Sequence, residues 1–534
     1  MQTENNIPQN FVPDSASPYQ TPGYSYSAPQ PAVKEPRIYS SSDSVFAFAA
    51  LILGFIFVNF VSTLHSGISI TLFTVAFIIF SLFFMKKNNI KQTSNSIMWI
   101  LIILAQSAVF MIYDNYYIKF PLFLVMAACT VYWIYGCSGC KEGKISDNLP
   151  AELIVSHTAI PFSNFNASPE AATFHFKNNK CGKKFFLIIA GLLAAVPVCA
   201  ITIGLLMDAD AAFSLVWNYI SKYILNDIFV YIFQFIIGIP VSFYFFGLLF
   251  GSVKNKEKAL KPDFGGKLKV IPQTLIYSSA TPLIAIYVLY FVSQLTYFLS
   301  AFKNALPYGY TYAQYARRGF FELCAIASLN LCIIAFMYLM TKREAGKSKA
   351  IRIYSLLLSV FTIVLIISAL SKMYMYIQTY GLTPLRVYTS WFMIILLLIF
   401  IAIILRQIFT KINCAKVITI IVISMSLIIS YSNTDYLIAK YNISRYQAGT
   451  LNELDIYSLS KLSNDGIVLL EEFTNSSNYA YRMQSKNILS QRASKYTNRD
   501  WRDFNISSLY SKKLLDKYKS SNSDPYRYNY TSST

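Results

Sequence analysis

Apolar runs of about the length of a transmembrane helix recur along most of this 534-residue chain. A helix needs about 20 apolar residues to cross about 30 Å of hydrocarbon. Eleven segments meet this requirement: 44–64, 67–85, 96–112, 118–136, 185–206, 228–251, 272–299, 319–340, 350–371, 387–409 and 414–432. Inside a bilayer every backbone polar group must be satisfied within the protein, which a helix achieves by itself. The sequence therefore predicts an all-α, polytopic transmembrane helix bundle of about eleven spans.

The composition agrees with a membrane protein and excludes an ordinary soluble enzyme. Apolar residues make up 55% of the chain and charged residues 13%, whereas roughly a quarter of a soluble protein is charged. The formal net charge is +20, and the basic residues occur in short clusters between the apolar runs. This distribution is typical of a polytopic protein and differs from the single basic patch of a nucleic-acid-binding protein. We expect the lipid bilayer, and no nucleic acid, as a partner.

Lys and Arg alternate in number from one side of the predicted spans to the other. With the N-terminus inside, the inner segments and adjoining span ends hold 25 of them and the outer loops hold 7. Cytoplasmic loops carry the excess of Lys and Arg in membrane proteins. None of the eight cysteines falls in a predicted outer segment, so no outer disulfide is expected. These counts predict an N-in, C-out protein of the plasma membrane.

Composition divides the chain into four predicted regions. Residues 1–43 hold seven of the 19 prolines and too few apolar residues to fold, so we expect a disordered cytoplasmic tail, or alternatively a docking peptide for a partner protein. Residues 44–432 form the transmembrane bundle. Residues 433–519 have apolar residues at helical spacing and predict a small helical extracytoplasmic region. Residues 520–534 are expected to be a disordered end.

Two connections between spans are also expected to contain helices. In the inner loop 137–184, the stretch ELIVSHTAIPFSNF is apolar but too short to span, and we expect it to lie along the membrane surface. The outer segment 207–227 has apolar residues at helical spacing and predicts an interfacial helix. Gly247 and Gly251 form a weak helix-packing motif in the sixth span.

The sequence gives little support for catalysis. Only three histidines are present, and no local motif of a nucleophile elbow accompanies them. The letters AGKS at 345–348 resemble the end of a phosphate-binding loop, but Thr341 occupies the position of the earlier glycine that the loop requires. We assign no catalytic residue, expect no cofactor, and leave enzymatic activity open while favouring a non-enzymatic protein.

Four residues that commonly bind zinc lie in or beside one inner loop: Cys137, Cys140, His175 and Cys181. Their spacing is loose, and Cys137 adjoins the end of a span. Unpaired thiols in a reducing compartment are therefore the favoured interpretation, and a zinc site is the alternative.

Polar residues inside the predicted spans are the stronger candidates for a functional site. Arg317, Arg318 and Glu322 open the eighth span at its outer end, and Asn330 lies two turns deeper. Arg318 and Glu322 are four residues apart and can pair on one helix face. Arg386, just before the tenth span, is on the same side of the membrane and could join them. Charged groups in a bilayer usually face the bundle interior or a wet cavity, although arginines can also snorkel to the headgroups.

Several segments resemble a known family of bacterial multipass proteins. They are YAQYARRGFFELCAIASLN at 312–330, IPFSNF at 160–165, YGLTPLRVYTSWF at 380–392 and NTDYLIAKYNISRY at 433–446. The sequence is similar to the family catalogued as domain of unknown function 4173, which is related to 4153, over about residues 44–473. The residues that match its pattern are Arg317, Glu322, Arg386, Asp435, Asn442 and Asp465. The resemblance implies a multipass protein of a bacterial plasma membrane and implies no reaction.

Three functions are compatible with these features. The leading hypothesis is a non-enzymatic sensor or a transporter-like bundle, with Arg317, Glu322, Asn330 and Arg386 as its polar centre near the outer face. The first alternative is an envelope enzyme such as a lipid-linked sugar transferase, for which the segment 207–227 would supply acidic residues. The second alternative is a membrane scaffold that binds partner proteins through its two tails.

Overall fold

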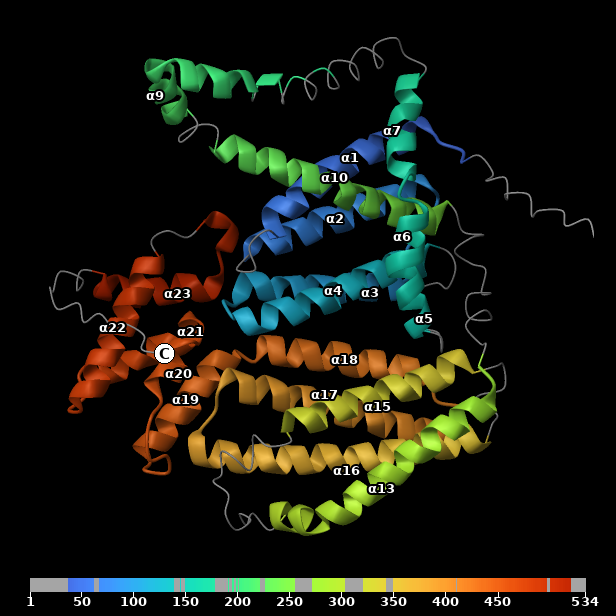
Figure 1. Cartoon of the computed structure of the whole chain (residues 1–534), viewed down its shortest axis with the longest axis vertical. Helices are drawn as coiled ribbons and strands as arrows, with labels where there is room; N and C mark the ends of the chain where they lie inside the picture. The colour runs from blue at the N-terminus through green and yellow to red at the C-terminus, as the bar shows by residue number, and fades with distance from the viewer. Residues whose placement is uncertain are drawn as a thin grey trace, which may run out of the picture.

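The computed structural model describes residues 37–61, 67–138, 145, 149–177, 191, 195, 198–199, 201–220, 226–254, 271–302, 320–341, 349–409, 411–496 and 500–519 (Figure 1). Helices dominate these residues, and the one β-type contact among them is an isolated bridge between Ile271 and Thr341. The predicted all-α class is therefore confirmed.

Ten of the described helices are long and apolar enough to cross a membrane. They are α1 (Ser41–Val61), α2 (Ile68–Lys87), α3 (Ser94–Ile112), α4 (Tyr116–Cys137), α10 (Asn226–Val253), α13 (Gln273–Phe302), α15 (Phe320–Met340), α16 (Lys349–Tyr380), α17 (Pro384–Ile408) and α18 (Cys414–Tyr431). Each corresponds to one predicted span. The remaining predicted span, 185–206, falls largely outside the described residues.

The first half of the bundle packs around one apolar core. Helices α1, α2, α3, α4 and α10 contribute to it, with α1 running along α10. Aromatic rings fill much of its interior: the centroids of Phe77 and Phe245 are 4.8 Å apart, and those of Phe57 and Phe73 are 5.1 Å apart. Such ring pairs stabilise a core beyond the area that they bury.

The second half has a separate apolar core, formed by α13, α15, α16 and α17. Leu358, Ile366 and Phe400 are fully buried in it. Helix α18 packs against α17 on one side and against α3 and α4 on the other, so it joins the two halves (Figure 1).

The apolar stretch of the inner loop forms helices that run across the spans rather than along them (Figure 1). We name α5 (Leu149–Ile154), the π-helix η1 (Val155–Ala159), α6 (Ile160–Ser163) and α7 (Ala167–Lys177) the transverse rod. A Cβ atom on Gly247 of α10 would lie 2.7 Å from the carbonyl oxygen of Pro161, and one on Gly251 would lie 2.4 Å from Nδ2 of Asn164. The two glycines therefore let the rod press directly on α10, in the packing role that their spacing predicts.

The predicted interfacial segment 207–227 contains one described helix, α9 (Ala211–Ile220). None of its residues is fully buried, although Phe213, Trp217 and Ile220 are half-buried. Asp210 begins the helix, because its carboxylate accepts from the backbone N–H groups of Ala212 and Phe213.

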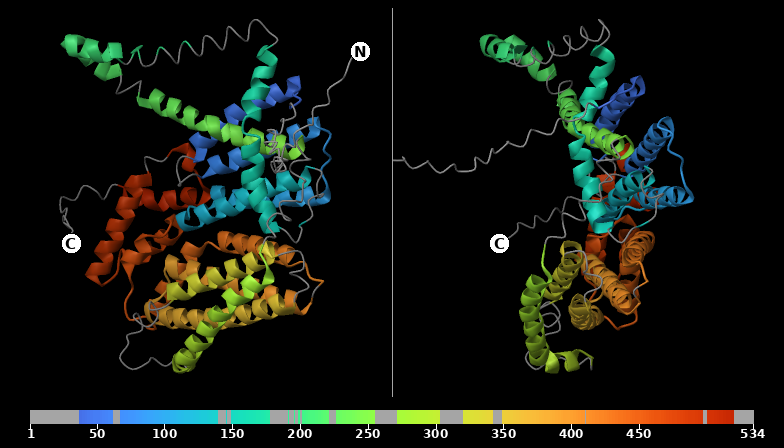
Figure 2. Two further views of the ribbon diagram at one scale, coloured as in Figure 1. Left: turned by 45° about the vertical axis from the view of Figure 1, so that its right-hand side comes forward. Right: turned by 90° about the vertical axis from the view of Figure 1, so that its right-hand side faces the viewer.

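The chain after the last span forms a group of short helices that we name the C-terminal module. Its elements are α19 (Thr434–Gln447), α20 (Ile456–Ser460), α21 (Asn464–Ile467), η3 (Val468–Phe473), α22 (Tyr479–Tyr496), η4 (Trp501–Asp503), α23 (Ile506–Leu515) and η5 (Asp516–Tyr518). A third apolar core lies inside it, and Leu382 and Val387 from the α16–α17 hairpin pack against that core. The module and the transverse rod lie at opposite ends of the spans (Figure 2); which end faces the cytoplasm stays a prediction.

Candidate functional site

The structure places the residues of the predicted intramembrane cluster in different surroundings. Asn330 is fully buried in α15, where its Oδ1 accepts from the Tyr287 hydroxyl at 2.6 Å and its Nδ2 donates to Thr362 Oγ1 at 2.8 Å. Asn330 thus joins α13, α15 and α16 by hydrogen bonds. Glu322 lies in the first turn of α15 and is exposed. Arg317 and Arg318 lie outside the described residues.

Arg386 lies in the first turn of α17 and caps the end of the preceding span. Its guanidinium donates to the carbonyl oxygens of Tyr380 at 3.0 Å and Gly381 at 2.6 Å, and stacks 4.0 Å from the ring centroid of Tyr376. A cation at a helix C-terminus satisfies free carbonyls and interacts favourably with the helix dipole. No contact of the described residues joins Arg386 to Glu322 or Asn330, so their grouping into one polar centre stays a prediction.

The zinc alternative gains no support from the described residues. Cys137 is buried at the end of α4, and His175 lies in α7. Cys140 and Cys181 lie outside the described part of the chain. Within that part, no three His, Cys, Asp or Glu residues are grouped so that they could hold a metal ion.

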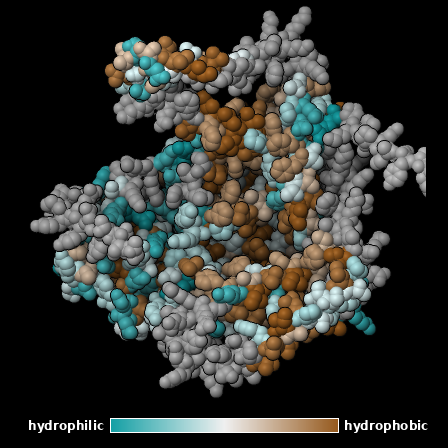
Figure 3. Space-filling view, viewed as in Figure 1, coloured by the Kyte–Doolittle hydropathy of each residue, from teal (hydrophilic) through white to brown (hydrophobic). Residues whose placement is uncertain are grey.

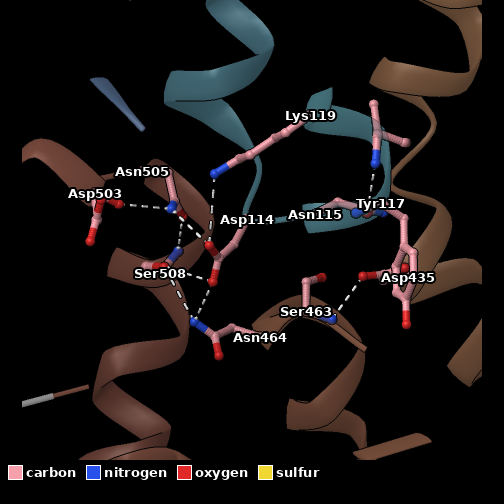
Figure 4. Close-up of polar contacts among 11 residues, drawn as sticks. Asp114, Asn115, Tyr117, Lys119, Asp435, Ser463, Asn464, Asp503, Asn505 and Ser508 are labelled. Carbon is pink, nitrogen blue, oxygen red and sulfur yellow. Dashed lines mark hydrogen bonds and ion pairs between the residues drawn. The ribbon is translucent and has the colours of Figure 1, made fainter. Parts of the chain in front are cut away.

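A different cluster of polar residues joins the spans to the C-terminal module (Figure 4). Its centre is Asp114, in the short loop between α3 and α4, whose side chain is 10% exposed. The Lys119 ammonium group, in the first turns of α4, lies 3.9 Å from Asp114 Oδ1, and its side chain is 5% exposed. Two opposite charges with so little exposure interact more strongly than a surface pair does.

Three side chains of the module donate to the same carboxylate. Asn464 Nδ2 lies 3.0 Å from Oδ2 of Asp114, Asn505 Nδ2 lies 3.2 Å from Oδ1, and Ser508 Oγ lies 3.4 Å from Oδ2. Hydrogen bonds to a charged group contribute more than those between neutral groups. We name Asp114, Lys119, Asn464, Asn505 and Ser508 the Asp114 network.

The local sequence explains how Asn505 reaches Asp114. Asn505 is the N-cap of α23, and its Oδ1 accepts from the backbone N–H of Ser508 at 2.8 Å. Asparagine is favoured at this position because its short side chain satisfies a free N–H of the first turn. Its amide nitrogen is then left to point away from the helix, towards Asp114.

Asn115, next to Asp114, forms a second set of bonds. Its Oδ1 caps α4 by accepting from the backbone N–H of Tyr117 at 3.0 Å. Its Nδ2 donates to the Tyr388 hydroxyl at 2.6 Å and to Thr434 Oγ1 at 3.0 Å. Asn115 therefore joins the start of α4 to α17 and to the start of α19.

Two further carboxylates lie close to the Asp114 network. Asp435 of α19 is 1% exposed; its Oδ2 accepts from the Ser463 N–H at 2.7 Å, and its Oδ1 has no hydrogen-bond partner among the described residues. Burial raises the pKa of Asp435 and is the largest influence on it; hydrogen bonds from Ser463 lower this pKa, and the charges of Asp465 and Asp114 raise it by smaller amounts. Burial also raises the pKa of Asp465 in α21.

The α16–α17 turn is held by the module as well. Gly381 adopts a φ of +73°, and Thr383 caps α17 by accepting from the Arg386 N–H. Asn442 of α19 bonds to the backbone of Leu382 in this turn.

The last part of the module contacts the α1–α2 hairpin. The backbone N–H groups of Gly67 and Ile68 donate at 2.8 Å to the carbonyl oxygens of Arg502 and Phe504. Arg502 in turn donates to the carbonyl oxygen of Asn59 at 3.0 Å. The module thus binds the ends of three hairpins, α1–α2, α3–α4 and α16–α17, which come from both halves of the bundle.

Sequence reasoning singled out only some members of this site. Asp435, Asn442 and Asp465 match the resembled family's pattern, but nothing in the sequence predicts what they contact. Lys119 was missed, although a lysine beside an aspartate at the start of an apolar span is a recognisable sign of a buried pair. Asn505 and Ser508 were missed too, and their N-cap spacing was the available sign.

The fold and the site define a polytopic helical membrane protein whose C-terminal module is docked on the span ends through buried carboxylates. The chain belongs to the family described as Domain of unknown function (DUF4153), whose profile matches residues 100–473. The sequence resemblance named family 4173, which stays a prediction; the profile that matches is that of its relative 4153. The match includes Asp114, Asp435 and Asn464 and ends before Asn505. No curated protein and no solved structure matches the chain.

Proposed function

We propose that the chain is a non-enzymatic membrane sensor that responds to acidification at its predicted outer face. The observation that carries the proposal is the convergence of three carboxylates, Asp114, Asp435 and Asp465, where the C-terminal module meets the spans. A buried carboxylate with an unpartnered oxygen is costly when ionised and much less costly when protonated. Asp435 is such a group.

The charged and titratable groups around Asp435 fit this role. Asp465 of α21 and Asp114 of the α3–α4 loop both add negative charge near it. Lys119 pairs with Asp114. The Tyr388 hydroxyl, from α17, is held by Asn115 and Thr434 at the start of α19. An ionised Asp435 is repelled by the negative charge near it at the docking surface, and protonation of Asp435 removes that repulsion.

The connection of the module to the spans supplies a way to transmit the change. Two residues, Ser432 and Asn433, separate α18 from α19, and Asn433 is left-handed with a φ of +47°. Helix α18 contacts both halves of the bundle. A tighter or looser docking of α19 therefore acts on both apolar cores through α18 and through the three hairpins.

A transporter-like function stays an alternative prediction. The observation that favours it is Asn330, a fully buried amide that joins three spans of the second half. Polar side chains between transmembrane helices serve in packing as well as in transport pathways. The envelope-enzyme and scaffold hypotheses also stay predictions.

A distance measurement tests the sensor proposal directly. Spin labels are placed on two exposed positions, Leu385 at the start of α17 and Tyr510 in α23, in a cysteine-free full-length protein reconstituted in lipid. We expect a narrow distance distribution at pH 5.5 and a broader or longer one at pH 8. In Asp435→Asn the distribution should be narrow at both pH values.

The matched control is Glu453→Gln, which neutralises an exposed carboxylate of the same module. It should keep the pH response of the unsubstituted protein. A distance distribution that does not change with pH, or a response that persists in Asp435→Asn, would overturn the proposal.

A further inference from the structure

An apolar crevice of about 480 Å³ lies in the first half of the bundle, where α4 and α10 face each other. Phe73 and Phe77 of α2 form its back, Met126 and Ala127 of α4 form one side, and Phe245 of α10 lies on the other. The transverse rod closes one end with Phe162 and Phe165. Its volume lies within the roughly 300–1,000 Å³ of pockets that hold small molecules.

The polar residues in the wall turn their polar atoms away from the crevice. The hydroxyls of Thr74 and Thr130 donate at 2.8 Å to carbonyl oxygens of their own helices. The Tyr244 hydroxyl donates to the carbonyl oxygen of His157 at 3.2 Å. The His157 ring is bonded through Nδ1 to the Leu153 carbonyl, and burial lowers the pKa of this histidine, so it is neutral at pH 7. The wall therefore presents methyl groups and rings, and it favours an apolar occupant.

The crevice is long and follows the helix axes. Its wall on α4 runs from Phe123 to Val131 and its wall on α10 from Pro240 to Leu248. At 1.5 Å per residue each of these stretches covers about 12 Å. A shape of this kind fits a flexible hydrocarbon chain better than a compact ligand.

The open side of the crevice continues into the surface that faces lipid. Pro240 is exposed, and Phe233 and Ile236, which are 64% and 55% exposed, lie seven and four residues before it on the same face of α10. Apolar side chains gather over α10 and the adjoining middle of the molecule on this side (Figure 3). Because all of these residues belong to a predicted transmembrane helix, the medium at the opening is the hydrocarbon of the bilayer.

We propose that this crevice is a binding site for one acyl chain of a membrane phospholipid, with the transverse rod closing the site at its cytoplasmic end. The chain enters sideways from the bilayer, so binding requires no passage through water. Occupancy fills a space that would otherwise leave the rings of α2 and α10 without contacts on one side, which stabilises the packing of α4 against α10. This inference is independent of the acid response proposed above.

Photocrosslinking of the full-length protein tests the proposal. The protein is reconstituted in phosphatidylglycerol vesicles that contain a small fraction of the same lipid with a diazirine on its acyl chain. We expect crosslinks at Phe165, Tyr244 and Phe245 to exceed those at Phe233, which is 64% exposed, at least fivefold. Equal labelling of crevice and exposed positions would show only bulk lipid contact and would overturn the proposal.

Two substitutions fill the crevice from opposite walls, so that the test survives if one of them fails to fold. Ala127→Trp acts from α4 and Val241→Trp from α10. Each should lower the crosslinks at Phe245 at least fivefold. The matched control, Leu124→Trp, places the same ring on an exposed face of α4 and should leave them unchanged.

A competition experiment distinguishes two lipids whose hydrocarbon chain could occupy the crevice, a phospholipid and a polyprenyl phosphate. Unlabelled phosphatidylglycerol should reduce the crevice crosslinks in proportion to its excess. If a polyprenyl phosphate removes the crosslinks and excess phosphatidylglycerol does not, the assignment to a phospholipid is overturned. Unchanged crosslinking in folded Ala127→Trp and Val241→Trp would overturn the site itself.

Discussion

The carboxamide of Asn442 bonds to both polar backbone atoms of Leu382. Its Oδ1 accepts from the Leu382 N–H at 2.7 Å, and its Nδ2 donates to the Leu382 carbonyl oxygen at 2.7 Å. One side chain of the C-terminal module thus completes the backbone hydrogen bonding of a turn between two spans. Asn442 is 6% exposed, so water replaces these bonds poorly.

The first prediction concerns that pair. Asn442→Ala leaves the Leu382 N–H and carbonyl without their partners, which should lower the free energy of unfolding by about 1–3 kcal/mol. Thermal unfolding of the purified protein, followed by tryptophan fluorescence, measures the change. Ser444→Ala, on an exposed position of the same helix, should change the unfolding temperature little. Equal effects of the two substitutions would show that the Asn442 bonds contribute nothing.

The second prediction concerns Asp114. Asp114→Ala removes the acceptor of three module side chains and the partner of Lys119, so it should cost about 3 kcal/mol or more, as the loss of one member of a buried ion pair does. The undocked module should then be cleaved faster by an added protease. Limited proteolysis with mass spectrometry measures the rate, and Asp516→Asn, on an exposed residue of η5, serves as the control. If Asp114→Ala is cleaved no faster than the control, docking does not depend on the network.

The third prediction follows from the raised pKa of Asp435. Its ordinary value is 3.8, and in the folded protein its pKa lies higher. The folded state therefore binds more protons than the unfolded state between these two values, and stability falls as the pH rises through that window. We expect a lower unfolding temperature at pH 8 than at pH 5.5, and a smaller difference in Asp435→Asn. A wild-type protein that is more stable at pH 8 would contradict the sign.

The fourth prediction distinguishes two causes of lost stability when alanine replaces a glycine: backbone strain and a close contact of the new Cβ atom. Gly381 has a φ of +73°, and a Cβ atom there would lie 2.5 Å from Asn442 Oδ1. Gly449 has a φ of +67° with open space around it. Gly449→Ala should therefore show only the strain of a left-handed residue, about 1 kcal/mol. Gly381→Ala should cost more.

A double substitution checks the origin of the additional cost. In Gly381→Ala combined with Asn442→Ala the close contact is gone, so the total loss of unfolding free energy should be smaller than the sum of the two single losses. Thermal unfolding of the four proteins provides the comparison. Additive losses would mean that the turn shifts to avoid the contact.

The fifth prediction concerns the intramembrane polar residues. Single cysteines replace Glu322, Asn330 and Ser477 in a cysteine-free protein, and intact cells are treated with a membrane-impermeant thiol reagent. The N-in, C-out topology predicts that Ser477→Cys reacts from outside. Labelling at Glu322→Cys but not at Asn330→Cys is expected from the exposed position of Glu322 and the full burial of Asn330. Labelling at Asn330→Cys would reveal a water-filled path and favour transport.

The spans were predictable because a bilayer sets both their length and their polarity. Ten of eleven predicted segments match described helices, nine of them within a few residues, while α16 runs nine residues beyond its predicted end at 371. Of the transverse rod, the stretch 152–165 was expected as an apolar segment too short to cross. The site was less predictable, because its members are far apart in the chain. Asp114 and Asn505 are 391 residues apart, and neither helical spacing nor composition determines which loop a distant helix contacts.

The predicted intramembrane cluster shows the same limit of reasoning from the sequence. Glu322 and Asn330 were grouped because they follow each other along one helix, yet one is exposed and the other is fully buried. Arg386 was grouped with them because it lies at the same end of the spans, but it bonds to the carbonyl oxygens of its own hairpin. Two residues at the same end of the spans can still point in different directions around their helix axes.

The position of the C-terminal module after the last described span has a consequence for biogenesis. Because α19 follows α18, every module element that contacts the three hairpins is synthesised after the last described span. While the ribosome is still making the bundle, Asn59, Asp114 and Leu382 have none of their module partners. The module therefore adds its bonds to two halves that α18 already joins, so that a chain interrupted before Asn505 would carry all ten described spans without the Asn505 and Ser508 bonds to Asp114.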